Sequence, residues 1–183
     1  MLTVRATSSG LWRLPAFDVL SDGAPIGQIA FGESSRFGVI RLRDKPYTVS
    51  PTEKREGIGW FLRRNIMDDK AEPCELKDAS GAVLATATPA GPGFRVALGR
   101  ETVEFRRVGL SEALPLGIPA GSWILQPSVG GEPLGAVAKQ HGLDRSINLL
   151  VPERFDDAQK CFLFWLRAKS EMERTARESS DLS

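Results

Sequence analysis

Few residues in this 183-residue chain have the type and spacing that chemistry at a protein site requires. His141, the only histidine, stands in the segment KQHGLD between two predicted strands. A zinc site needs further cysteine, histidine or carboxylate ligands at defined spacings, and a catalytic base needs a nucleophile beside it. Neither pattern surrounds His141, so we interpret it as a histidine of a surface loop.

The acidic and thiol residues also lack the arrangement that catalysis needs. Two carboxylate pairs, Asp68/Asp69 and Asp156/Asp157, are adjacent in sequence, and adjacent residues on a strand point to opposite faces. We interpret the first pair as a turn and the second as the start of a helix. The two cysteines are far apart in sequence and form no disulfide framework. The sequence therefore predicts a protein that is not an enzyme and has no metal or cofactor.

Basic residues offer the remaining chemistry, which is the binding of anionic groups. Arg41, Arg43 and Lys45 alternate, so we expect them to share one face where a strand enters its turn. Together with Arg63 and Arg64 they could bind phosphate groups if the fold brings them together. The alternative is an ordinary solvated outer face. The formal net charge of +1 predicts no nucleic-acid partner, because no overall field attracts one.

The apolar run CFLFWL, at 161–166, indicates what the C-terminal part of the chain does. It belongs to a helix predicted over 156–175, with Asp156 as its N-cap. Its first half is apolar on every side, which is typical of a buried helix. The apolar part, 158–168, would be about 16 Å long, half of a bilayer core, so a membrane span is excluded. A helix enclosed by the chain's own sheet is favoured over one that faces a partner or lies on a membrane.

Short strands separated by glycine turns make up the rest of the chain. Segments such as FDVL-SDGA-PIGQIAF predict hairpins, with Gly23, Gly81 and Gly131 in the turns. Segment 108–121 contains Pro115 and Pro119 and is predicted to be a crossing loop. Residues 1–175 are expected to form one domain, followed by a disordered tail at 176–183. Twelve strands are predicted, at 17–20, 25–31, 36–42, 46–50, 58–64, 73–77, 82–87, 93–98, 101–107, 122–126, 133–139 and 145–151.

Twelve strands followed by an apolar helix predict a closed antiparallel barrel with the helix at its centre, since a barrel of that size is too wide for its own side chains to fill. The hairpins DGAPIGQIA and GGEPLGAVA, and then SINLLVPERFDDAQKCFLFWL, resemble the tubby C-terminal-like superfamily, which includes LURP-one-related proteins and phospholipid scramblases. The resemblance covers roughly 12–172. It implies a twelve-stranded barrel around a hydrophobic C-terminal helix. It also implies phosphoinositide or membrane association, although no headgroup-binding motif of the family maps onto residues here.

These observations favour a non-enzymatic binding module, whose target is a protein partner or an anionic lipid headgroup. We expect it in the cytoplasm, at the membrane periphery if it binds headgroups, because the N-terminus lacks the apolar region of a signal peptide. The alternative is a lipocalin-like carrier of an apolar small molecule, suggested by GLW at 10–12. Lipocalins pack their helix outside the barrel, where a polar face would be expected.

Overall fold

Twelve antiparallel strands form the wall of the protein in a computed structural model that describes residues 1–7, 15–32, 36–52, 72–128, 130–139 and 146–180. The strands are β1 (Leu2–Ala6), β2 (Ala16–Ser21), β3 (Ala24–Phe31), β4 (Gly38–Leu42), β5 (Lys45–Pro51), β6 (Cys74–Lys77), β7 (Val83–Ala90), β8 (Gly93–Leu98), β9 (Glu101–Arg107), β10 (Trp123–Pro127), β11 (Gly135–Lys139) and β12 (Ile147–Leu150).

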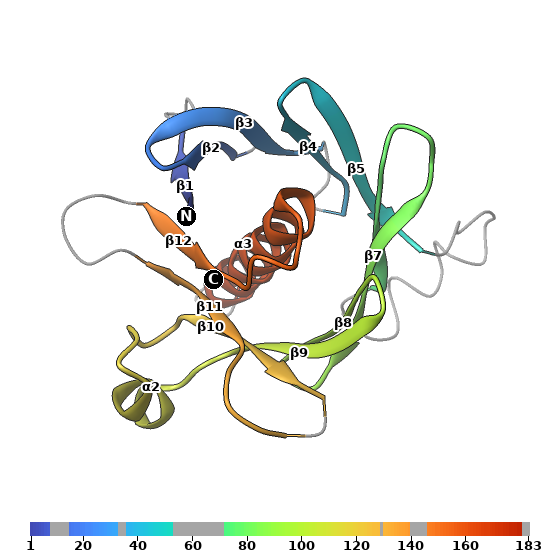
Figure 1. Ribbon diagram of the computed structural model, residues 1–183. Helices are drawn as coiled ribbons and strands as arrows, with labels where there is room; N and C mark the ends of the chain where they lie inside the picture. Colours follow the sequence, from blue (N-terminus) through green and yellow to red (C-terminus); the bar gives the residue numbers. More distant parts are fainter. Residues whose placement is uncertain (8–14, 33–35, 53–71, 129, 140–145, 181–183) are drawn as a thin grey trace, which may run out of the picture.

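Each strand pairs with its neighbours in sequence, and the first strand pairs with the last. Leu2 lies opposite Leu149 and Val4 lies opposite Ile147, so β1 and β12 close the sheet into a barrel (Figure 1). Closure satisfies the backbone groups that an open edge would expose. The predicted closed barrel of twelve antiparallel strands is confirmed.

Side chains alternate between the interior and the outer surface along the strands, as the pleat of a strand requires. In β4 the residues Gly38, Ile40 and Leu42 are buried, whereas Val39 and Arg41 between them are exposed. The inward-facing positions of the barrel are mostly Val, Ile, Leu and Phe. The barrel wall therefore supplies a continuous apolar lining.

Helix α3 (Asp157–Ser180) runs through the centre of this ring (Figure 1). Asp156 begins it with reciprocal bonds: the Gln159 backbone N–H donates to Asp156 Oδ1 at 2.7 Å, and the Asp156 N–H donates to Gln159 Oε1 at 3.1 Å. This is a capping box, which satisfies two donors at the helix start. All nine residues from 161 to 169 are buried. The prediction of an apolar helix enclosed by the sheet is confirmed.

Aromatic side chains of α3 fill the middle of the barrel. The Trp165 ring stacks on Phe31 of β3, with 5.4 Å between ring centroids, and Phe164 meets Phe17 of β2 edge-on at 4.9 Å. Gly38 of β4 lies directly against the Trp165 indole, where a Cβ atom would overlap the ring. Individual side chains of α3 therefore pack closely against individual residues of the barrel wall.

The structure differs from the sequence prediction in three places. Strand β1 was not predicted. The predicted strand at 58–64 lies outside the described residues and stays a prediction. The prediction of a loop over 108–121 is wrong in part, because this segment contains α2 (Leu110–Leu116). Residues 176–180, predicted to belong to a disordered tail, continue α3, while 181–183 lie outside the description.

Candidate functional site: the surface around α2

A short helix, α2, lies on the outside of the barrel between β9 and β10 (Figure 1). Gly109 precedes it in an extended conformation, and Gly117 ends it in the left-handed conformation with φ of 65°. The Gly117 N–H donates to the Leu114 carbonyl at 3.2 Å, and the Ile118 N–H donates to the Ala113 carbonyl at 3.2 Å. A glycine in this position is a common way to end a helix. Pro115, in the last turn, has no backbone N–H to donate, so the short helix lacks one internal hydrogen bond there.

One apolar residue of α2 attaches it to the barrel wall. Ala113 is buried against the outward-facing side chains of Val108, Ile124 and Ala136, and Ile118 packs at the margin of this small cluster. The cluster lies outside the main core, so α2 has its own hydrophobic contact with the sheet. The small alanine side chain lets the helix backbone approach the sheet closely.

An ion pair holds the same helix from its first turn. The Arg106 guanidinium on β9 donates from Nη1 to both carboxylate oxygens of Glu112, at 2.9 and 3.2 Å. Its Nη2 donates to Gln126 Oε1 of β10 at 3.4 Å. The hydrogen bond from Arg106, and then its charge, lower the pKa of the Glu112 carboxyl. Glu112 is therefore ionised at neutral pH, and α2 is fixed on two sides.

Two apolar side chains of α2 face solvent side by side. Leu110 is 68% exposed and Leu114 is 74% exposed. They are four residues apart and therefore lie on the same face of the helix. We call Leu110 and Leu114 the leucine face; Leu116, which is 40% exposed, points to another side. Single exposed leucines are ordinary, but two neighbouring ones on a seven-residue helix form a small apolar patch of the kind found at interaction sites.

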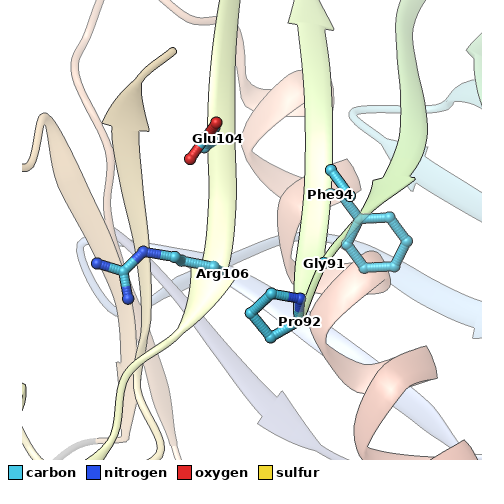
Figure 2. Close-up of a pocket in the computed structure, with 6 residues that line it drawn as sticks. Gly91, Pro92, Phe94, Glu104 and Arg106 are labelled. Atoms are coloured by element: carbon cyan, nitrogen blue, oxygen red, sulfur yellow. The ribbon is translucent and has the colours of Figure 1, made fainter. Parts of the chain in front are cut away.

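A shallow pocket of about 300 Å³ lies on the same side of the barrel. Figure 2 shows Glu104 and Arg106 projecting from β9, with Pro92 of the β7–β8 turn beside them. Arg106 also holds Glu112, so it joins the pocket to α2. We call the leucine face together with this pocket the α2 surface. The pocket is lined by Ala90, Gly91, Pro92, Phe94, Glu104 and Arg106.

The basic residues predicted to bind anions lie elsewhere, on the β4–β5 hairpin. Arg41, Arg43 and Lys45 are exposed, and Arg43 Nη2 lies 3.3 Å from Asp157 Oδ2 at the start of α3. Arg63 and Arg64 lie outside the described residues. Whether any of these five residues binds an anion stays a prediction.

The prediction that Arg41, Arg43 and Lys45 share one face is wrong. Arg43 and Asp44 form a tight turn with φ of 47° and 66°, and this turn places Leu42 opposite Lys45. Directly opposed residues share a face of the sheet, so Lys45 lies on the side of the buried Leu42, at the rim of the barrel. Arg41 lies on the outer face instead. Alternation along one strand does not continue through a two-residue turn.

The other chemically active side chains provide no reactive site in the described part of the chain. Burial raises the pKa of the Cys74 thiol to about 12 and raises that of Cys161 further, so neither forms the reactive thiolate at neutral pH. The described residues contain no group of three His, Cys, Asp or Glu side chains able to hold a metal ion. His141, Asp68 and Asp69 lie outside the description. In the described part of the chain, no helix combines the length and apolar character that crossing a membrane requires.

The sequence prediction missed α2 because Pro115, inside the helix, and Pro119, beyond it, indicate a loop. A signal was present: Leu110, Ala113 and Leu114 have the i, i+3, i+4 spacing of a helix face, and Gly109 and Gly117 stand at its ends. That spacing predicts a helix with a buried leucine stripe. The structure instead buries Ala113 and exposes the leucines, which tertiary packing alone decides.

The chain matches no protein-family model, no curated protein and no solved structure. The barrel and its central helix are consistent with the tubby-like architecture without identifying the family. The fold itself is established by the described residues: they form a closed twelve-stranded antiparallel barrel that encloses the C-terminal helix.

Proposed function

We propose that this chain is a non-enzymatic binding module that docks a protein partner on the α2 surface. The observation that carries this proposal is the leucine face, with Leu110 and Leu114 about two-thirds to three-quarters exposed on a helix fixed to a rigid wall. Rigid presentation matters because an interface residue that is already ordered loses little entropy on binding. The partner would bury the leucines in an apolar cleft of its own.

The charges around the leucine face favour a protein over an anionic membrane. Glu104, Arg106 and Glu112 carry both signs, and Arg106 is already engaged by Glu112. An anionic lipid surface attracts clusters of unpaired cations, which these three residues do not provide. An apolar centre with a polar rim of mixed charge is the usual anatomy of a protein interface.

The architecture of the barrel restricts the ways in which a partner can bind. Closure leaves no strand edge in the described barrel on which a partner could add a strand. Trp165 and its neighbours on α3 occupy the interior, so a lipocalin-like carrier would have to displace the helix to make room for an apolar ligand. Recognition through side chains on the outer wall is the remaining route.

We further infer membership of the tubby-like superfamily, which the enclosed C-terminal helix and the count of twelve strands support. Binding of an anionic headgroup, which that resemblance implies, has its own supporting observation. The β4–β5 hairpin exposes Arg41, Arg43 and Lys45 within five residues. The ion pair of Arg43 with Asp157 reduces the free positive charge, so this is the second candidate.

The test uses three purified proteins: the wild type, the double variant Leu110→Ser/Leu114→Ser and the control Leu150→Ser. Leu150 is exposed on β12, so the control makes the same substitution away from α2. Proteins retained from a lysate are identified, purified and titrated back against each chain. We expect saturable binding to the wild type that weakens at least tenfold in the double variant, because burying each leucine in the partner contributes about 1.5 to 3 kcal/mol. The control should bind like the wild type.

Partner binding that is equal in the wild type and the double variant would overturn the docking site. Flotation with neutral, anionic and phosphoinositide-containing vesicles at two salt concentrations tests the second candidate. Salt-sensitive flotation with anionic vesicles that is lost when Arg41 and Lys45 are replaced by Ser would make headgroup recognition the function instead.

A further inference from the structure

Two cations of α3 are buried where the helix leaves the barrel, and they differ in their partners. Lys169 is 3% exposed, and its ammonium lies 3.7 Å from Glu173 and 5.7 Å from the centre of the Trp165 ring. Arg167 is 4% exposed, and its Nε has no hydrogen-bond partner among the described residues. A buried charge without a partner is costly. The ion pair with Glu173 offsets the cost of burying Lys169, whereas no ion pair among the described residues does so for Arg167.

Among the described residues, Glu171 is the carboxylate whose charge acts on Arg167, and it has other partners as well. Glu171 lies one turn further along α3, on the same face. It accepts a hydrogen bond from the Trp123 indole at 3.5 Å, lies 3.4 Å from Arg107 Nε and receives Arg174 Nη2 at 2.8 Å. Glu171 therefore offsets the charge of Arg167 only in part.

In the network around Glu171, counted over described residues only, positive charges outnumber negative ones. Three guanidinium groups, those of Arg107, Arg167 and Arg174, interact with two carboxylates, those of Glu171 and Glu178. Burial lowers the pKa of the Arg167 guanidinium; the Glu171 charge raises it and the Arg107 charge lowers it again. An added anion beside Arg167 would balance this network.

We propose that the mouth of the barrel at the Arg167 side of α3 binds an oxyanion, a phosphate or carboxylate group, between Arg167 and Arg107. The planar guanidinium donates in a fixed fork that matches these two groups, which a lysine does not. Arg107 and Glu171, whose charges act on Arg167, are partly exposed. The β4–β5 hairpin lies elsewhere, because its Arg43 pairs with Asp157 at the start of α3.

Thermal unfolding in a chloride buffer, with sodium phosphate replacing chloride at constant ionic strength, tests the site. Sodium acetate is the carboxylate probe. Vesicles that contain phosphatidic acid distinguish a lipid phosphate from a free one. For the wild type we expect the Tm to rise by roughly 3 to 6 °C when the bound probe is at ten times its Kd. The response identifies the oxyanion as phosphate, carboxylate or lipid phosphate.

Arg167→Met should remove the response and still fold, because it removes the desolvation cost of an incompletely paired buried charge and keeps the length of the apolar stem. Arg167→Lys should reduce the response, since it keeps the charge without the fork. Arg95→Met, the same substitution at an exposed position of β8, should respond like the wild type. A Tm response of equal size in Arg167→Met would overturn the site, as would a wild type that responds to none of the three probes.

Discussion

The indole of Trp165 lies at the centre of the barrel, and the residues around it define the core. It stacks on Phe31 and Phe162, and Gly38, which pairs with Phe31 on the neighbouring strand β4, leaves room for the ring. The apolar run from 161 to 166 predicted this burial, because residues that are apolar on every side of a helix require an apolar environment on every side. The partner at Gly38 was not predictable, since a single glycine in a strand does not disclose what approaches it.

Trp165→Asp should prevent folding. An unpaired carboxylate in the core, together with the lost packing of a large ring, costs about 4 kcal/mol or more, a large part of the 5 to 15 kcal/mol that stabilises a typical domain. Circular dichroism and thermal unfolding would measure the loss. Leu114→Asp, at an exposed position, is the control and should change the stability by about 1 kcal/mol or less. A folded Trp165→Asp protein would contradict the enclosed helix.

Gly38→Ala should destabilise the fold by about 1 to 3 kcal/mol, because the added Cβ overlaps the Trp165 ring and either the ring or the strand must shift. Denaturant unfolding measures the change. Gly109→Ala is the matched control: its Cβ would meet nothing within 4 Å, and its φ is −75°. Equal stabilities of the two variants would show that the Trp165 ring does not pack directly against the backbone of Gly38.

At the scale of elements, the two helices were predictable to different degrees. The start of α3 followed from Asp156 and the apolar run, and the capping box with Gln159 confirms that N-cap. Helix α2 has a signal in the spacing of Leu110, Ala113 and Leu114, but the exposure of the two leucines was not predictable. Their orientation depends on the packing of Ala113 against Val108, Ile124 and Ala136. These three residues come from different parts of the chain, which meet only in the folded state.

The attachment of α2 should depend on pH through Glu112. Its pKa is lowered from 4.5 in the folded state, so the ion pair with Arg106 contributes fully above the unfolded pKa and is lost as the pH falls through the folded pKa. We expect the amide resonances of α2 to be constant from neutral pH to about pH 4.5 and to change only below it.

Glu112→Gln provides the control, because a glutamine has no charge to lose. In this variant α2 should be held less firmly at all pH values, and its resonances should not follow this titration. A pH response of the same size in Glu112→Gln would assign the titration to another group.

At the scale of the whole molecule, the barrel is closed by a pairing that local patterns do not reveal. Local patterns, namely glycine turns and short alternating or apolar runs, predicted eleven of the observed strands. Strand β1 was not among them, and its pairing with β12, about 145 residues away, as in the pairing of Thr3 with Asn148, is the contact that closes the barrel. The basic residues were grouped wrongly for a related reason: the turn at Arg43 and Asp44 changes which face each side chain occupies.

Native-state hydrogen exchange of the wild type tests the central claim, a barrel whose interior is filled by its own C-terminal helix. Residues 161–166 should exchange only through global unfolding, with an opening free energy equal to that measured by denaturant, whereas 174–178, beyond the barrel, should exchange through small local openings. Exchange of 161–166 through an opening that leaves the amides of β4 and β10 protected would contradict it, because the helix would then leave an intact barrel.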